Sequence, residues 1–260
     1  MPAPINPFKA ALARGDLQLG CWAAFAEPYA TEVLATAGFD WLVIDGEHAP
    51  NDLRSTLAQL QVLDASAAHP VVRLPAGEHW MIKRVLDAGA QTLLIPMVES
   101  AAQARALVQA MRYPPAGTRG SGAMLARASR FAAIPDYFAT ADAQMCLLVQ
   151  VESRAGLAAL DEILAVEGVD GVFIGPADLA ADMGHGDDTE SPAVTAAIGD
   201  AIDRITAAGK AAGILALAPE AATRYRDRGV RFLAVGIDVL MLAGAARATV
   251  DAWKRCRKND

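Results

Sequence analysis

Three ionisable residues lie within four positions, directly after a short apolar run. The run covers residues 41–44, and Asp45, Glu47 and His48 follow it, with Gly46 between the two acids. Such groups are costly at the end of a buried segment unless they are paired or used. A carboxylate close to an imidazole can orient it and hold it as a general base. The segment is therefore a candidate catalytic cluster, and the alternative is a loop of solvated charges.

Two further acidic residues follow later apolar runs. Glu152 comes directly after residues 145–151, and Asp178 comes shortly after residues 171–174. If the two runs are neighbouring parallel strands, their ends lie about 4.8 Å apart. Carboxylates this close repel each other unless one is protonated or a cation lies between them. Two oxygen ligands with room for water and substrate are typical of Mg²⁺ or Mn²⁺, so the pair is a candidate metal site. A protonated pair or two salt-bridged carboxylates are the alternatives.

A permanent cation and a helix start complete the candidate set. Arg73 belongs to the apolar run 71–74, and its guanidinium could bind a developing enolate oxygen. It could instead form a salt bridge to Glu47 or Glu152. Residues 175–179, Gly-Pro-Ala-Asp-Leu, open a short predicted helix. The free backbone N–H groups at such a start could hold a substrate carboxylate.

The lysines and nucleophiles decide between mechanisms. A Schiff-base aldolase needs a lysine at the end of a strand. The lysines fall in predicted helices or before a strand: Lys9, Lys83, Lys210, Lys254 and Lys258. No Gly-x-Ser-x-Gly segment occurs, and no cysteine ends a predicted strand beside a histidine. Metal-assisted enolisation is therefore the favoured chemistry.

These residues need a scaffold that gathers strand ends, and the hydrophobic pattern predicts one. Eight apolar runs alternate with helical segments: residues 19–25, 41–44, 71–74, 92–98, 145–151, 171–174, 212–216 and 232–235. This rhythm predicts an α/β fold, a (β/α)₈ TIM barrel in a single domain over residues 1–260. A doubly wound open sheet is the alternative, but the Gly-x-Gly-x-x-Gly turn that it would favour is absent.

Helices are predicted between the strands and at both ends. The ranges are 6–14, 28–36, 51–63, 79–87, 101–111, 157–166, 179–183, 193–208, 219–228 and 239–257. The first is an extra N-terminal helix and the last is a long C-terminal helix. Residues 112–141 form a long connection rich in proline and glycine, and its length predicts a lid or a binding loop.

The composition indicates which classes of binding partner are disfavoured and which cellular compartment is expected. The 260 residues are 53% hydrophobic and carry a formal net charge of −7, which argues against nucleic acid or an anionic membrane as a partner. The three cysteines, Cys21, Cys146 and Cys256, show no Cys-x-x-Cys spacing, which argues for a reducing compartment. No signal peptide or membrane segment is evident, so a cytoplasmic location is expected.

Several motifs at matching spacing carry a resemblance to a known family. They are Asp45-Gly-Glu-His-Ala-Pro-Asn, Pro-Val-Val-Arg73, Gln150-Val-Glu152, Gly175-Pro-Ala-Asp-Leu, and segments 112–117, 125–130 and 134–137. Through nearly its whole length the chain resembles the HpcH/HpaI aldolases. These are class II pyruvate aldolases, which depend on a divalent metal.

The resemblance implies a role for each matching residue. Glu152 and Asp178 would hold a divalent ion, Mg²⁺, Mn²⁺ or Co²⁺. Arg73 would stabilise the enolate, and His48, paired with Asp45, would act as the base. The remaining positions would bind substrate: pyruvate at Gln150, its carboxylate at Gly175, Pro176 and Ala177, and the aldehyde at Trp22 and Leu215.

The resemblance also implies a substrate and an assembly. The motifs are most similar to those of enzymes in aromatic catabolism that cleave 4-hydroxy-2-oxoheptanedioate to pyruvate and succinic semialdehyde. A homohexamer is expected, a trimer of dimers that exchange the C-terminal helix. The alternatives are a sugar-acid aldolase acting on 2-keto-3-deoxy-rhamnonate or 5-keto-4-deoxy-glucarate, and a barrel that only binds a keto acid. A citrate-lyase-like CoA-ester lyase would need a basic patch, which the sequence does not reveal.

Overall fold

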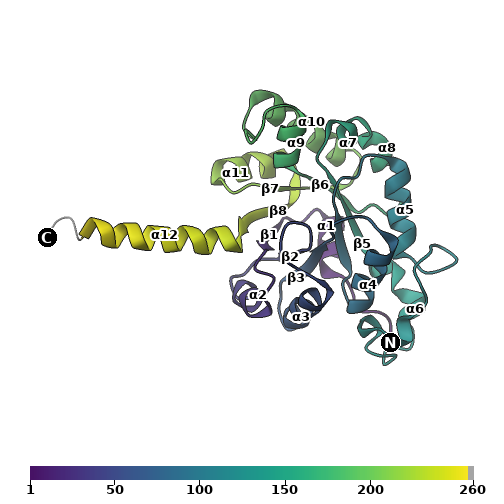
Figure 1. Cartoon of the computed structure of the whole chain (residues 1–260). Coiled ribbons are helices and arrows are strands. Elements are labelled where there is room, and N and C mark those ends of the chain that lie inside the picture. The colour runs from purple at the N-terminus through teal and green to yellow at the C-terminus, as the bar shows by residue number, and fades with distance from the viewer. Residues whose placement is uncertain (257–260) are drawn as a thin grey trace.

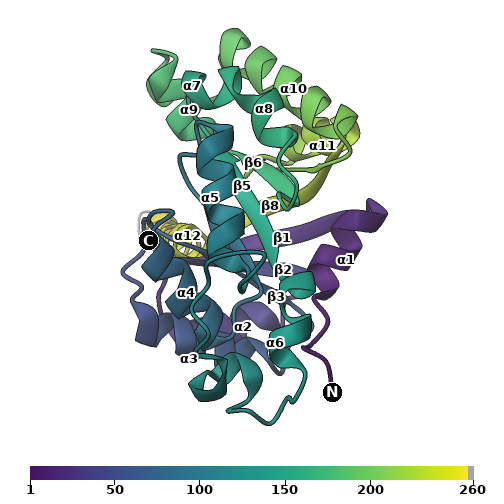
Figure 2. The same cartoon turned by 90° about the vertical axis from the view of Figure 1, so that its right-hand side faces the viewer.

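A computed structural model describes residues 1–256, and Figures 1 and 2 show them in two views. Eight parallel strands pair in chain order, and β8 pairs with β1 to close the barrel. The strands are β1 (Gln18–Ala23), β2 (Trp41–Asp45), β3 (His69–Arg73), β4 (Thr92–Ile95), β5 (Cys146–Val151), β6 (Gly171–Ile174), β7 (Ala211–Leu215) and β8 (Val230–Ile237). The predicted barrel is confirmed, and the strand ends differ from prediction by three residues at most.

Twelve helices are described in residues 1–256, and most of them cover the outside of the barrel. They are α1 (Pro7–Arg14), α2 (Pro28–Ala35), α3 (Leu53–Leu63), α4 (His79–Ala88), α5 (Ala101–Met111), α6 (Tyr137–Thr140), α7 (Arg154–Ala158), α8 (Leu160–Leu164), α9 (Pro176–Asp182), α10 (Pro192–Ala207), α11 (Pro219–Arg228) and α12 (Asp238–Cys256). Three short 3₁₀ turns are η1 (Ala123–Leu125), η2 (Arg127–Ser129) and η3 (Asp142–Gln144). The single helix predicted over 157–166 is wrong: two short helices, α7 and α8, meet at Ala159. Residue 257 of the predicted last helix lies outside the described residues.

Strand alternation divides the side chains into two layers. Along β2, Leu42 and Ile44 pack outward against the helices, whereas Trp41 and Val43 point into the barrel. Continuing this period of two places Asp45 on the inner side at the carboxyl end of β2. The same count along β3 places Arg73 there, beyond the inward-facing Val71. The pattern that fills the barrel with apolar side chains therefore also delivers polar ones to its mouth.

The barrel interior is filled by aromatic rings that pack over glycine. Trp41 is fully buried and contacts the rings of Trp22 and Phe232 edge-on, at 6.1 and 6.0 Å between centroids. A Cβ atom on Gly20 would lie 2.1 Å from a carbon of the Trp41 ring. Glycine at this position is what admits the indole, and the packed interior forms a solid floor below the mouth.

Helix α1 closes the opposite end of the barrel. Its Phe8 ring stacks on His69 at the start of β3, with 5.5 Å between ring centroids. The Asn6 amide donates to the Thr92 hydroxyl and to the Gln144 carbonyl. Burial lowers the pKa of His69 to about 4, so this end of the barrel is plugged by a neutral ring.

The long connection 112–141 also lies at the closed end, so the prediction of a lid over the site of the same chain is wrong. It leads from α5 into the start of β5 and packs with the N-terminal segment. Its apolar residues form a small core of their own: Ala3, Tyr113, Ala123, Ile134, Tyr137 and Ala141. The buried Arg119 guanidinium lies over the Tyr113 ring and bonds to Asp87 at 2.9 Å. The segment is thus anchored to the base of the barrel.

Helix α12 leaves the barrel instead of covering it. Figure 1 shows it extending away from β8 and from the body of the molecule. Across residues 1–256, none of the helices combines the length and apolar character needed to cross a membrane.

Candidate active site

One cavity at the carboxyl ends of the strands gathers the predicted site residues. Its volume is about 360 Å³. Ten of the eleven candidates line it: Trp22, Asp45, His48, Arg73, Gln150, Gly175, Pro176, Ala177, Asp178 and Leu215. The eleventh, Glu152, is buried beside Gln150. Residues spread over six strand–helix units thus converge on one hollow at the barrel mouth.

The Arg73 guanidinium is held between two carboxylates. Its Nε and Nη2 donate to the Asp45 carboxylate at 2.9 and 2.8 Å, a bidentate arrangement. Nη1 lies 2.8 Å from Glu47 Oε2 as an ion pair, although its geometry does not meet that of a hydrogen bond. The guanidinium carbon also stands 5.4 Å from the centroid of the Trp22 ring. Arg73 is therefore a cation held in a fixed position by contacts within the chain.

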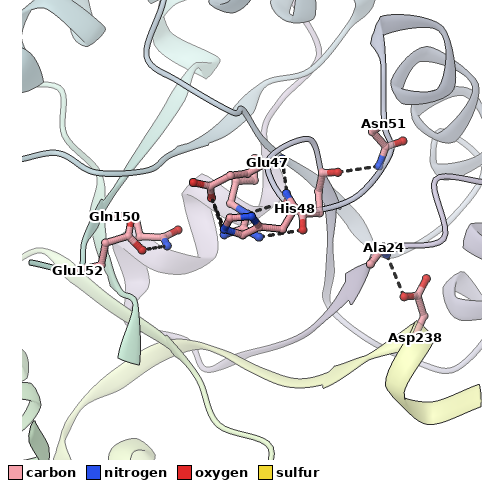
Figure 3. A network of polar contacts seen from close by, with 9 residues as sticks. Ala24, Glu47, His48, Asn51, Gln150, Glu152 and Asp238 are labelled. Atoms are coloured by element: carbon pink, nitrogen blue, oxygen red, sulfur yellow. Dashed lines mark hydrogen bonds and ion pairs between the residues drawn. The ribbon is translucent and has the colours of Figure 1, made fainter. Parts of the chain in front are cut away.

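The expected pairing of Asp45 with the His48 ring is not found: the Asp45 carboxylate contacts backbone N–H groups and Arg73 instead. Asp45 Oδ1 accepts from the backbone N–H groups of Glu47 and His48, at 3.0 and 3.3 Å, and its carboxylate is otherwise engaged by Arg73. The acidic group nearest the imidazole is Glu47, whose Oε2 lies 3.8 Å from His48 Nε2 (Figure 3). Asp45 thus shapes the loop, and Glu47 stands between His48 and Arg73.

His48 is the accessible member of this group. Its side chain is 66% exposed, whereas that of Arg73 is 8% exposed. The Asn51 amide donates to the Asp45 carbonyl at 2.8 Å and stabilises the loop that carries the imidazole. An exposed imidazole on a fixed loop can exchange a proton with solvent, which suits a general base.

Glu152 is buried below the cavity and held by three neighbours. Its Oε1 accepts from the backbone N–H of Met97 at 2.8 Å. Its Oε2 accepts from the Gln150 amide (Figure 3). A Cβ atom on Gly175 would lie 2.4 Å from Oε2, so only glycine admits the carboxylate here.

The negative charges of the carboxylates in the site repel one another. Burial raises the pKa of Glu152, and the charges of Asp178 and Glu47 raise it further, against the hydrogen bonds from Gln150 and Met97. Burial also raises the pKa of Glu47, which Arg73 and His48 counteract. Asp178 is exposed in the first turn of α9, where the helix dipole favours negative charge. Negative charge is thus concentrated around one point of the mouth.

The residues present fit a divalent cation. Gln150 Oε1 is buried next to Glu152 without a hydrogen-bond partner in the described chain. The other atoms that could bind a metal ion here are carboxylate oxygens. No cluster of three or more His, Cys, Asp or Glu in residues 1–256 could hold a metal. Glu152 and Asp178 would therefore leave several positions to water and substrate, an arrangement typical of Mg²⁺ and Mn²⁺.

The cavity also has an apolar wall, which includes Ala24, Leu215, Ile237, Val239 and Leu240. The Asp238 carboxylate fixes this wall, because it accepts from the Ala24 N–H at 2.9 Å (Figure 3). It also accepts from the Val239 N–H at 2.7 Å. The end of β1 is thereby tied to the first turn of α12.

The ion pair between Arg73 and Glu47 confirms the salt bridge that the sequence offered as an alternative role for Arg73. Two further contributors to the site have no role in the sequence-based prediction. Asp238 follows an apolar strand, which is the signal that could have identified it. Met97 contributes a backbone N–H group, and nothing in its residue type indicates this.

Comparisons with known proteins find a matching family and several similar proteins. A model of the HpcH/HpaI aldolase/citrate lyase family matches residues 18–245. A hydroxypyruvate/pyruvate aldolase of Roseovarius nubinhibens is 72% identical, over 98% of this chain and 99% of that protein. One of Deinococcus radiodurans is 58% identical, over 98% and 94% of the two chains. The crystal structure of an HpcH/HpaI aldolase/citrate lyase family protein from Burkholderia cenocepacia is 41% identical, covers 96% of this chain and 99% of that chain, and has a TM-score of 0.92.

The raised pKa of Glu152 predicts a pH-dependent stability for the metal-free protein. The folded state binds the Glu152 proton more readily than the unfolded chain does. The free energy of unfolding therefore falls as pH rises from the ordinary glutamate value of 4.5 through the raised pKa. Glu152→Gln removes this contribution, so its advantage over the wild type should grow with pH. Urea unfolding in EDTA between pH 5 and pH 7.5 measures this, with the exposed Glu162→Gln as control; parallel curves for wild type and Glu152→Gln would contradict it.

Proposed function

The chain belongs to the HpcH/HpaI aldolase/citrate lyase family, and we propose that it cleaves 4-hydroxy-2-oxo acids to pyruvate and an aldehyde with the help of a divalent cation. As a member of this family it is an aldolase, a carbon–carbon lyase. The observation that carries the proposal is the convergence of Arg73, His48, Gln150 and Asp178 on one cavity above Glu152.

The proposed chemistry begins with substrate binding. Backbone N–H groups at the start of α9, next to Ala177, receive the substrate carboxylate, and Gln150 contacts the keto-acid half. Glu152 and Asp178 would hold a divalent cation, which would supply positive charge for the oxygens of the 2-oxo acid. The carboxylate contact at α9 and the Gln150 contact orient the substrate with its C4 hydroxyl toward His48.

Bond cleavage then requires a base and an electron sink. The His48 imidazole takes the proton of the C4 hydroxyl, the C4–O bond becomes the aldehyde carbonyl, and the C3–C4 bond breaks. Its electron pair becomes the enolate of pyruvate, whose charge Arg73 stabilises. Return of the proton to C3 gives pyruvate. Asp45 and Glu47 fix Arg73 during these steps, because both contact the guanidinium.

The lining of the cavity favours an uncharged aldehyde as the second substrate. Arg73 is the only arginine or lysine that lines the cavity within residues 1–256, and it is already paired with two carboxylates. The second carboxylate of 4-hydroxy-2-oxoheptanedioate would therefore meet the apolar wall without a cation. Leaving a buried polar group unpaired costs about 1–3 kcal/mol. An uncharged aldehyde such as lactaldehyde avoids that cost. The names of the relatives add hydroxypyruvate as a second donor to test.

Aldol addition by the purified protein tests the proposal. We expect pyruvate or hydroxypyruvate to condense with lactaldehyde when Mg²⁺, Mn²⁺ or Co²⁺ is present, and EDTA to abolish the reaction. Succinic semialdehyde and tartronate semialdehyde should react about tenfold more slowly or worse, since 1.4 kcal/mol corresponds to a factor of ten. Full activity in EDTA would exclude a metal role. Absence of any condensation, with pyruvate still bound, would favour the barrel that only binds a keto acid.

The base is tested by substitution of His48. His48→Ala should lower kcat by roughly 10²–10⁴-fold, the usual contribution of a general base, while the Kd for pyruvate changes little. His185→Ala is the matched control, because His185 is exposed in the loop between α9 and α10. Steady-state kinetics and pyruvate titration measure the two quantities; unchanged kcat in His48→Ala would reject the role.

We also propose that α12 packs against a second copy of the chain in a homohexamer. Five of its large apolar side chains are 45–69% exposed: Leu240, Met241, Leu242, Val250 and Trp253. A helix with this many exposed apolar groups is favoured against a protein surface. A native mass near six times the 27.2 kDa of the chain is expected, and a monomeric mass at micromolar concentration would contradict it.

A further inference from the structure

The backbone at Met97 adopts a conformation that non-glycine residues rarely take. Its φ is +52°, in the left-handed region, directly after Pro96. Contact between the Cβ atom and the backbone disfavours this region for any residue with a side chain. A conformation of this kind persists only where the surrounding structure enforces it, and it is often found at functional sites.

The left-handed turn ends β4 early and redirects the chain. The predicted strand over 92–98 stops at Ile95, the last residue of β4 that pairs with β5. Pro96 has no N–H group to continue the ladder. Beyond the turn, the chain bonds to the end of β5 again, because the Val98 N–H donates to the Gln150 carbonyl at 3.0 Å. The Ser153 hydroxyl then donates to Glu99 at 2.6 Å.

Within this turn, the Met97 N–H is the group that reaches the site. It donates to Glu152 Oε1 at 2.8 Å, as a hydrogen bond to a buried carboxylate. Of the five non-glycine residues with positive φ in residues 1–256, Met97 is the one whose N–H meets a predicted metal ligand. The Met97 side chain is 47% exposed, so its own packing is a minor part of this contact.

Glu152 needs such a donor more than an exposed acid would. It is 3% exposed and lies within the field of Asp178 and Glu47. A carboxylate can hold a cation only when its oxygens are correctly oriented. The Met97 N–H fixes Oε1, while Gln150 and Gly175 constrain Oε2.

We propose that the left-handed backbone of Met97 is a positioning device that orients the Glu152 carboxylate for the divalent cation. The inference rests on the proposed function, in which Glu152 is a ligand. Its specific content is that the backbone conformation at residue 97, and not the methionine side chain, sets the affinity for the cation.

A graded set of substitutions separates the two contributions. Glycine adopts positive φ without strain, so Met97→Gly should bind Mn²⁺ within about threefold of the wild type. Valine is β-branched and disfavours this region strongly, so Met97→Val should turn the N–H away from Glu152. Loss of an outer-shell partner typically lowers metal affinity roughly 10–100-fold, and we expect a decrease in that range.

The measurement is Mn²⁺ titration of the EDTA-stripped full-length protein, followed by the electron paramagnetic resonance of free Mn²⁺. Thermal unfolding in EDTA is recorded beside it, because a merely structural residue would change stability without changing Mn²⁺ affinity. Met124→Val is the matched control, since Met124 is an exposed methionine in η1 without positive φ. Its affinity should equal that of the wild type.

Two results would overturn the inference. Wild-type Mn²⁺ affinity in folded Met97→Val would show that the backbone conformation is unimportant. A tenfold or greater loss in Met97→Gly would show that the side chain matters instead, and this arm decides the question even if the valine variant fails to fold. Glu152→Gln identifies a failure of the proposed function: if it binds Mn²⁺ as the wild type does, Glu152 is not a ligand and the inference fails with it.

Discussion

The Glu152 carboxylate is buried at the end of β5, below a cavity that Asp178 lines and Glu47 adjoins. Removing an ionised group from water and surrounding it with like charges are both unfavourable. The local structure compensates with one backbone donor, one amide donor and a glycine that leaves room. A cation would balance the remaining charge. The site thus carries an excess of negative charge, which a bound cation would neutralise.

Arg73 follows a different principle from Glu152. Its charge is balanced within the chain by Asp45 and Glu47, so its position does not depend on a substrate. Preorganised groups of this kind stabilise developing charge without reorganising at the moment of reaction. The barrel mouth therefore combines the Arg73 guanidinium, whose charge is already paired, with the buried Glu152 carboxylate, whose charge is not paired by a cation of the described chain.

Much of this arrangement could be predicted from the sequence because it follows from periodicity. Apolar runs of strand length identify the eight strands, and alternation places Asp45 and Arg73 on the inner side of the mouth. Partner choice within a cluster does not follow from periodicity. Asp45 and Glu47 are both close to His48 in sequence. The direction of each carboxylate decides that Asp45 pairs with Arg73, whereas Glu47 lies near both Arg73 and His48.

Backbone features were harder still to predict. Strand β4 ends at Ile95 because of a turn whose key group is an N–H, and every residue but proline has one. The long connection 112–141 was expected near the site because of its length, yet length carries no information about which end of the barrel it covers. Its position follows from the order of elements: any link from a helix into the next strand of such a barrel must run to the amino end.

The contact between Asp238 and the end of β1 has a consequence for how such enzymes diversify. The residues that follow Asp238, Val239 and Leu240, line the cavity and begin the helix that departs from the barrel. Under the proposed function, acceptor recognition and subunit association would therefore share one short stretch of chain. Exchanging C-terminal segments between relatives would transfer both traits together, so a new mode of association and a new acceptor range can arise in a single genetic event.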